Sequence, residues 1–357
     1  AGGLGSDAGI VDLPSTIRRV TALAPPEVGA RVAARAQAEP GPRLPAYSDL
    51  PAAPLGGRSA WGIFGPGDSP GTVALQTPER IAESARLVRT GRLFPLNAPA
   101  TVPHPPLFLR RALKHTLLHE AGTPGFDDKM DDFFPQGSSQ WDSLAHVGYA
   151  PGAFYNGATE DDIRAGRRNT IDRWARRGLA GRGVLIDVEA VLRGRDPAYH
   201  PGTSCAVTVE DLEAGRRLAG VEWQPGDVLL LHTGFLHWYT QQQAPVREKM
   251  AAGEDFAAVG LERSEAIVEY LWDARVSAVA ADNGAVEVWP PDWEGGPFGF
   301  LHRMLIGQLG LALGELWWLH DLALSCRGDG RYAVFVTSAP LNVPGGVGSP
   351  ANALAIK

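Results

Sequence analysis

The feature that most constrains the fold is a repeated alternation of capped helices and short apolar strands between residues 159 and 281. Two threonines are each followed three residues later by an aspartate, a spacing typical of a first helical turn: Thr159 with Asp162, and Thr208 with Asp211. Short strands rich in aliphatic residues follow these helices, at 184–188, 228–231 and 276–281. Because strands of this kind are buried between layers of helices, we expect an α/β fold with a mixed, largely buried central sheet.

The rest of the chain is expected to form an N-terminal arm and one large domain. Residues 1–60 are rich in Pro, Gly and Ala and contain one helical stretch at 27–37, which predicts an arm that wraps the body or a neighbouring subunit. Residues 61–357 are expected to form a single domain, whose first helix is capped by Thr77 and ends at Gly91. Within this domain, residues 95–135 read as an inserted region, with an amphipathic helix over 109–120 followed by an acidic cluster.

Composition excludes several classes of protein. A hydrophobic share of 44% with 20% charged residues is typical of a globular protein and excludes general disorder. The net charge of -7 argues against nucleic acid as a partner, and the longest apolar runs fall short of the roughly 20 residues that a membrane span needs. The two cysteines, Cys205 and Cys326, lack metal-binding spacing, and no signal peptide is visible, so we expect buried thiols in a cytoplasmic protein.

The segment 136–146, Gln-Gly-Ser-Ser-Gln-Trp-Asp-Ser-Leu-Ala-His, is the strongest candidate for an active site. Asp142 and His146 are four residues apart and offer the mixed oxygen and nitrogen ligands that a divalent metal ion accepts. Further ligand types recur at His302 and Glu315, and the latter lies in an apolar run, where a carboxylate needs a counter-charge or a metal. These four residues, brought together by the fold, would make a site for a metal-activated water.

Other groups of residues compete for a chemical role. His115 and His119 are four residues apart in the expected helix, but Thr116 follows the first histidine where zinc proteases have glutamate, and the surrounding leucines read as packing positions. Polar residues also close or follow three apolar strands, where they face either a pocket or solvent: Asp187, His232 and Asp282. Of these, His232 has the chemistry of a general acid or base.

The segment 136–146 resembles the hallmark His-x-Gly-Thr-His-x-Asp-x-Pro-x-His of the metal-dependent cyclase family, which includes bacterial arylformamidases, isatin hydrolases and putative polyketide cyclases. The resemblance extends over roughly residues 45–357, with matching stretches at 61–62, 75–79, 181–187, 225–231, 302–315 and 345–350. It implies the swivelling β/β/α fold of that family, a homodimer or homotetramer, and a site for one divalent ion, Zn²⁺ or Mn²⁺. The ligands that it implies are Asp142, His146, His302 and Glu315.

Two departures from the family pattern modify these expectations. Gln136 and Gln140 stand where the hallmark has its first two histidines, and a glutamine amide is a weak metal ligand, better suited to a hydrogen bond with a substrate carbonyl. We therefore expect one metal ion instead of two. His232 stands where relatives tend to have an arginine before Thr-Gly, which removes a permanent cation and makes a carboxylate on the substrate less expected at that position.

These residues predict a metal-dependent hydrolase that acts on a small molecule, a cyclic or aryl amide, imide or lactone, through a metal-bound water. The acid and base candidates are Asp142, His146, Glu315 and His232. The candidates for substrate contact are Gln136, Gln140, Trp141 as an aromatic wall, Ser139 and Trp61. Two alternatives stay open: a cyclase or lyase of secondary metabolism without net hydrolysis, and a metal-free binding protein or degenerate homologue, which the two absent histidines would fit.

Overall fold

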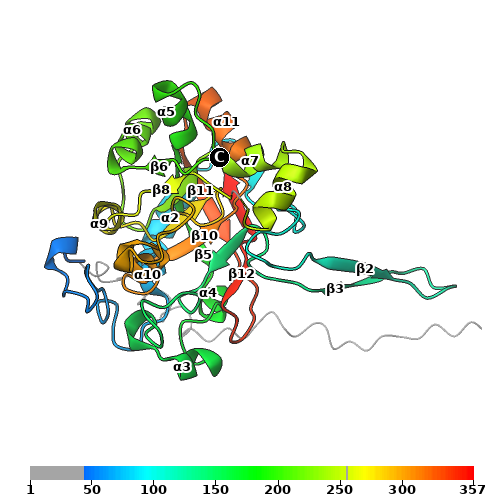
Figure 1. Cartoon of the computed structure of the whole chain (residues 1–357), viewed down its shortest axis with the longest axis horizontal. Coiled ribbons are helices and arrows are strands. Elements are labelled where there is room, and N and C mark those ends of the chain that lie inside the picture. Colours follow the sequence, from blue (N-terminus) through cyan, green and yellow to red (C-terminus); the bar gives the residue numbers. More distant parts are fainter. Residues whose placement is uncertain (1–43, 255) are drawn as a thin grey trace, which may run out of the picture. The chain divides into compact units, whose positions relative to one another are not determined.

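The computed structural model describes residues 44–254 and 256–357 of the chain. In this part a mixed nine-stranded sheet forms the centre (Figure 1). Its strands follow one another in space as β1 (Leu93–Pro95), β13 (Ala353–Ile356), β11 (Ala333–Ser338), β5 (Leu179–Asp187), β7 (Val228–His232), β9 (Ala278–Ala281), β10 (Ala312–Glu315), β4 (Gln140–Asp142) and β12 (Gly348–Pro350). The neighbours from β5 to β10 are parallel, and the outer strands pair antiparallel. The expected α/β fold with a mixed central sheet is confirmed.

Helices connect and cover these strands, and short strand pairs lie outside the large sheet. The helices are α2 (Pro78–Ala85), α3 (Glu160–Arg164), α4 (Asp172–Arg177), α5 (Val188–Arg195), α6 (Val209–Ala219), α7 (Phe235–Thr240), α8 (Ala244–Ala251), α9 (Glu265–Asp273), α10 (His302–Leu305) and α11 (His320–Asp329). The outlying strands are β2 (Lys114–Leu118) with β3 (Asp127–Asp131), and β6 (Ala206–Val207) with β8 (Gly260–Leu261). Short 3-10 segments span Tyr47–Asp49, Gly71–Leu75, Tyr155–Gly157 and Gly296–Phe298.

The helix starts follow the capping signals of the sequence. The hydroxyls of Thr159 and Thr208 each accept from the backbone N–H three residues on, and the aspartate there accepts from the threonine N–H in return. The hydroxyl of Thr77 accepts from the backbone N–H of Arg80 without such a return bond, and α2 ends at Ala85, so its expected end at Gly91 is wrong. The chain turns after Ala85 because it must reach β1, which begins two residues beyond Gly91.

The core runs along the parallel strands. Every residue of β7, β9 and β10 is buried, as expected for strands covered on both faces. Figure 1 shows α6 and α9 on the same side of this sheet. The polar residues at the carboxyl ends of these strands therefore emerge from a rigid platform.

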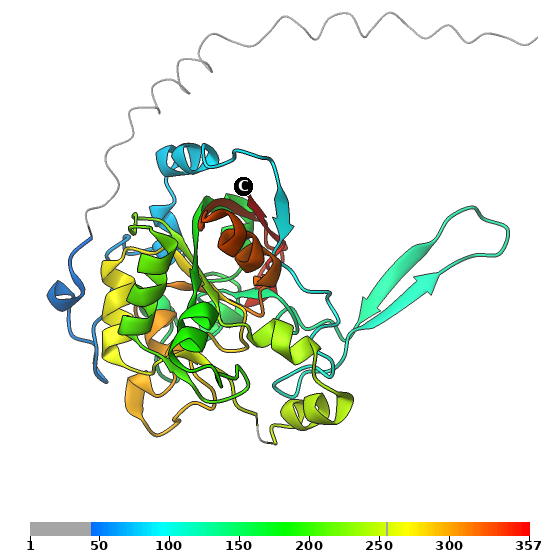
Figure 2. The same cartoon turned by 90° about the horizontal axis from the view of Figure 1, so that it is seen from above.

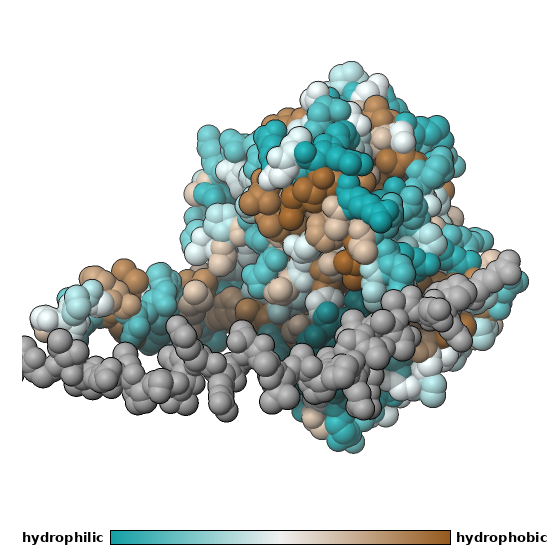
Figure 3. Space-filling view, turned by 180° about the vertical axis from the view of Figure 1, so that it is seen from behind, coloured by the Kyte–Doolittle hydropathy of each residue, from teal (hydrophilic) through white to brown (hydrophobic). Residues whose placement is uncertain are grey.

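The region 95–135 contains a projecting β-hairpin where the sequence analysis expected a helix over 109–120 (Figures 1 and 2). β2 pairs with β3, and every residue of both strands is exposed. Figure 3 shows hydrophobic side chains along this hairpin, where Leu117 and Met130 are 64% and 55% exposed. The helix prediction is wrong because this stretch pairs with the acidic segment that follows it, and helical periodicity does not report a partner strand.

The hairpin also separates the two histidines that were expected on one helix face. His115 lies 2.9 Å from a carboxylate oxygen of Asp128, and the ring of His119 stacks on Phe126 at 4.3 Å. Both histidines are exposed and each has its own contact. They do not form the zinc-binding pair that their spacing allowed.

Three other expectations concern the N-terminal segment, membranes and the cysteines. The helix expected at 27–37 lies outside the described residues, whereas residues 44–60 pack on the body, where the indole N–H of Trp272 donates to the carbonyl of Pro45 at 3.1 Å. Within 44–254 and 256–357, no helix has the length and apolar character needed to cross a membrane. Cys326 is a buried free thiol as expected, and Cys205 is half-buried.

Candidate metal centre

Strand pairing and a short helix bring three of the four predicted ligands together. The antiparallel register of β4 and β10 places Glu315 opposite Gln140, two residues before Asp142. Because side chains alternate along a strand, Gln140 and Asp142 share one face of β4, and Trp141 lies on the other. His302 opens α10 and reaches the same place, with Nε2 3.0 Å from Oε1 of Glu315 and 3.8 Å from Oδ2 of Asp142.

His146 lies at the accessible edge of this group. Its Nε2 is 3.6 Å from Oδ1 of Asp142, and its side chain is 26% exposed, whereas Asp142 is fully buried. The rings of His146 and His302 are 6.5 Å apart. Asp142, His302 and Glu315 each offer a ligand atom within 4.8 Å of the others, and His146 lies beside Asp142 outside this group of three.

The oxygens of Asp142 give the best indication that a cation belongs here. Both are buried and lack a hydrogen-bond donor among the described residues, and so does Oε1 of the fully buried Gln140. Burial raises the pKa of this carboxyl, but the nearby His146 and His302 lower it, so in the ion-free protein imidazoles supply the counter-charge that a bound cation would provide. Carboxylates and imidazoles are ligands that Zn²⁺ and Mn²⁺ accept, so the residues present fit a divalent ion.

Protons take up part of the negative charge in the ion-free site. Burial raises the pKa of Glu315 to about 7, and the neighbouring charge of Asp142 adds to this effect. Burial alone would lower the pKa of His302, but its contacts with Glu287, Asp142 and Glu315 raise it well above the ordinary value. Burial lowers the pKa of His146. The site therefore holds protons that a divalent ion would have to displace.

Glu287 is a member of the site that the sequence analysis missed. It is fully buried, and its two carboxylate oxygens lie 3.1 and 3.0 Å from Nδ1 of His302. With the proton on Nδ1 donated to Glu287, Nε2 is left to face Glu315 and Asp142. The sequence signal was an acid in the apolar run 285–289, the same kind of signal that singled out Glu315.

The turn that carries Glu287 is fixed by its surroundings. Val286 has φ +58°, which is rare for a β-branched residue, and its backbone N–H donates to Oδ1 of Asn283 at 2.9 Å. Gly260 passes so close that a Cβ there would lie 2.2 Å from the carbonyl carbon of Glu287. Strained backbone of this kind persists where the surrounding structure holds it, and here it presents a carboxylate to His302.

The two glutamines occupy different positions in the site. The amide N–H of Gln140 donates to Oε2 of Glu315 at 2.5 Å. The side chain of Gln140 therefore lies next to the candidate metal ligands without being one of them. Gln136 is also buried, and its backbone carbonyl accepts from the guanidinium of Arg110 at 2.5 Å. Gln140 therefore orients Glu315 while its own carbonyl oxygen stays without a described partner.

The other residues expected to contact a substrate make contacts typical of structural residues. Ser139 bonds two backbone groups, and the indole N–H of Trp61 donates to a backbone carbonyl at 2.9 Å. Trp141 donates to the hydroxyl of Ser338 at 2.9 Å and is 1% exposed, on the face of β4 opposite to Asp142. The aromatic wall expected at Trp141 has no support in these contacts, because the indole lies in the core.

His232 belongs to a separate cluster at the carboxyl ends of β5 and β7. Its Nδ1 lies 2.9 Å from Asp187, and its Nε2 lies 3.9 Å from Asp282. Burial would lower the pKa of His232, but these acids raise it above the ordinary value. Asp187, Glu189 and His232 are close enough to offer three metal ligands, yet Arg327 pairs with both acids, at 2.6 and 3.0 Å. The cluster is therefore already neutralised by cations of the chain.

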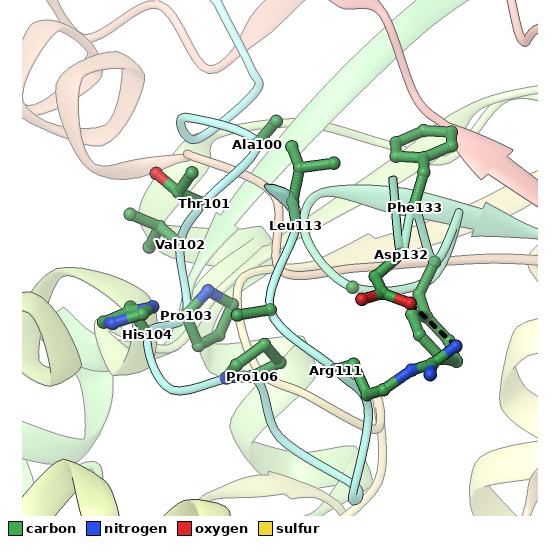
Figure 4. Close-up of a pocket in the computed structure, with 13 residues that line it drawn as sticks. Ala100, Thr101, Val102, Pro103, His104, Pro106, Arg111, Leu113, Asp132 and Phe133 are labelled. Atoms are coloured by element: carbon green, nitrogen blue, oxygen red, sulfur yellow. Dashed lines mark ion pairs between the residues drawn. The ribbon is translucent and has the colours of Figure 1, made fainter. Parts of the chain in front are cut away.

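A pocket of about 380 Å³ lies at the base of the hairpin (Figure 4). Its walls include Val102, Leu113 and Phe133, and the ion pair of Arg111 with Asp132, 2.7 Å long, lies among them. None of the four candidate ligands lines it, but it includes a residue of the segment 136–146, namely Gly137. Its volume is that of a site for a small molecule.

Comparison with known proteins gives a consistent result. Residues 84–288 match a family model described as a putative cyclase. A crystal structure described as that of a novel cyclase superimposes with a TM-score of 0.74 and 31% sequence identity, covering 84% of this chain and 99% of that chain. No match was found among curated protein sequences.

More distant solved structures share the fold. Isatin hydrolase A from Labrenzia aggregata, bound to benzyl benzoate, superimposes with a TM-score of 0.54 at 15% identity, covering 74% of this chain and 93% of that chain. Isatin hydrolase A from Ralstonia solanacearum gives a TM-score of 0.50 at 18% identity, with 78% and 97% covered. At these identities the likeness shows the fold alone.

Proposed function

Because the chain belongs to the cyclase family, we propose that it is a metal-dependent hydrolase of a small cyclic or aryl amide, imide or lactone. The observation that carries this proposal is the pair of buried oxygens on Asp142, which lack a donor in the described residues and face His302 and Glu315. A single divalent ion, Zn²⁺ or Mn²⁺, would satisfy these oxygens. The hydrolase names of the distant structural neighbours are consistent with the reaction class.

Each residue of the centre has a distinct task in this proposal. A divalent ion, when bound, lowers the pKa of a water molecule and polarises the carbonyl that is attacked. Asp142, His302 and Glu315 hold the ion, and Gln140 keeps the carboxylate of Glu315 in place. His146 is neutral near pH 7 because burial lowers its pKa, and its accessible position suits it to accept a proton during attack.

A second candidate reaction follows from the related structure described as a cyclase. The same centre could polarise a carbonyl for ring closure or ring opening without adding water. The mass of the product separates the two reactions, because hydrolysis adds one water to the substrate. We also propose, from the family resemblance, a homodimer or homotetramer, which sedimentation of the purified chain would test.

The experiment that tests the proposal is elemental analysis of protein purified without a chelator or a metal-affinity tag. We expect about one zinc or manganese ion per chain, lost when Asp142 and His302 are both replaced by alanine. The matched control replaces two histidines of the hairpin, His115→Ala with His119→Ala, and should keep the ion. Retention of metal justifies screening lactones, imides and formyl-anilides for hydrolysis.

Two results would refute the proposed function. One is wild-type protein that takes up no metal even after incubation with Zn²⁺ and Mn²⁺. The other is equal metal content in the Asp142 and His302 double variant and the wild type, which would place the ion elsewhere.

A further inference from the structure

Arg110 is a half-buried cation beside the candidate metal centre, and no described carboxylate pairs with it. Its neighbours Arg111 and Lys114 both form ion pairs with Asp132, at 2.7 and 2.8 Å, whereas Arg110 forms none with a described residue. Burial and nearer charges dominate the pKa values of Asp142, His146 and Glu315, but the positive charge of Arg110 also lowers all three. Arg110 therefore lies close enough for its charge to reach the candidate ligands.

The loop that carries Arg110 is held from two sides. The guanidinium donates through Nη1 to the backbone carbonyl of Gln136 at 2.5 Å and lies over the ring of Phe108, 5.2 Å from its centre. Phe108 has φ +60°, and its ring meets that of Trp289 edge-on at 5.0 Å, two residues beyond Glu287. The loop thus bridges the start of the segment 136–146 and the turn behind His302, so the position of Arg110 is fixed.

The charge balance shows what Arg110 is free to bind. Asp142, Glu287 and Glu315 bring three negative charges, and a divalent ion offsets two of them while the imidazoles are neutral. Without Arg110, the centre with its bound ion would keep one negative charge and would repel an anion. With Arg110 the centre is neutral, and the guanidinium keeps unused donors in the geometry that matches a carboxylate.

Arg110 itself does not line the pocket of Figure 4, but the residues that follow it and its partner Gln136 in the sequence do. Arg111 follows Arg110, Gly137 follows Gln136, and both residues line the pocket. Its remaining walls are largely apolar, with prolines and phenylalanines. A molecule with an acidic group and an aromatic ring could therefore place the acid on Arg110 and the ring in this pocket.

We propose that Arg110 binds the carboxylate of an aromatic acid at this centre. The proposal rests on the proposed function for the origin of that group, because hydrolysis of an amide or lactone releases a carboxylate, and a substrate can also carry one. It modifies the expectation from the sequence, where His232 in place of arginine argued against a carboxylate. The cation is supplied by a different segment of the chain.

Paired probes that differ only in charge test the proposal. Titration calorimetry with benzoate and benzamide should show that the wild type binds benzoate about tenfold more tightly, a difference that charge-assisted hydrogen bonds can supply. The variant Arg110→Gln should lose this preference, and Arg110→Lys should retain part of it. The control Arg164→Gln removes an exposed arginine of α3 that pairs with Glu160 and does not line this pocket, and it should behave as the wild type.

Metal content and melting temperature, measured on the same samples, keep the two proposals separable. Loss of the benzoate preference in Arg110→Gln, with metal and fold retained, supports the assignment. A wild type without the preference, or an Arg110→Gln variant that keeps it, overturns the assignment and leaves the metal centre untouched. Once a hydrolysed compound is found, a rise in KM in Arg110→Gln identifies a substrate carboxylate, and weaker inhibition by the product acid alone identifies a product carboxylate.

Discussion

Replacing Glu287 by glutamine should weaken metal binding while leaving the fold intact. The change keeps the size of the side chain and one acceptor oxygen, but it removes the charge that lies 3.0 Å from Nδ1 of His302 in a fully buried position. Hydrogen bonds to charged groups contribute about 1.5–3 kcal/mol. Loss of such a partner behind a metal-binding histidine typically reduces metal affinity about 10–100-fold, equivalent to about 1.4–2.8 kcal/mol. The two magnitudes agree.

The assay is a competition for Zn²⁺ between the protein and a chromophoric chelator at pH 7. Glu287→Asp keeps the charge on a shorter side chain and should lie between the wild type and Glu287→Gln. The exposed Glu269 on α9 provides the control, because Glu269→Gln makes the same chemical change far from His302 in the sequence and on the surface. Equal zinc affinity in Glu287→Gln and the wild type, with melting temperatures that also agree, would refute the role assigned to this carboxylate.

Three more predictions follow from contacts of the described residues. Gly260→Ala places a Cβ 2.2 Å from the backbone of Glu287 and should lower the free energy of unfolding by about 1–3 kcal/mol, measured in urea; an unchanged midpoint would contradict it. The pKa of Glu315, raised to about 7 from the ordinary 4.5, means that the ion-free protein loses stability as the pH rises through this window, and that apparent zinc affinity increases over the same range. A flat affinity profile between about pH 5 and 8 would argue against Glu315 as a ligand. Arg327→Ala leaves the buried Asp187 without its arginine and should cost about 2–3 kcal/mol on thermal unfolding, whereas a shift within error would show that the ion pair is dispensable.

Local signals in the sequence predicted the helix–strand alternation well. The capping hydroxyls of Thr159 and Thr208 act over three residues, and the apolar strands β5, β7 and β9 are continuous in the sequence, so both could be read directly. The hairpin could not be read from the sequence in this way. β2 forms a strand because it pairs with β3, and the periodicity of a single segment does not reveal its partner.

The composition of the candidate site was only partly predictable. The chemistry of Asp142, His302 and Glu315 indicated a metal, and the family resemblance linked residues that are far apart in the sequence. Glu287 carried the same signal as Glu315 but has no hallmark position, and the role of Arg110 depends on the loop that fixes it. The burial of Trp141 in the core could not be read from the sequence, because its orientation follows from the register of β4, which neighbouring strands determine.

The pairing of β4 has a consequence for the order in which the protein assembles during synthesis. This three-residue strand carries Asp142 and lies between β10 and β12, both of which are made much later. A growing chain that has passed Asp142 on the ribosome therefore has nothing against which to fix that carboxylate. The strand gains its second neighbour only when Gly348–Pro350 has emerged from the exit tunnel. The proposed metal centre would accordingly be completed late in biosynthesis, after the residues of the parallel strands have been made.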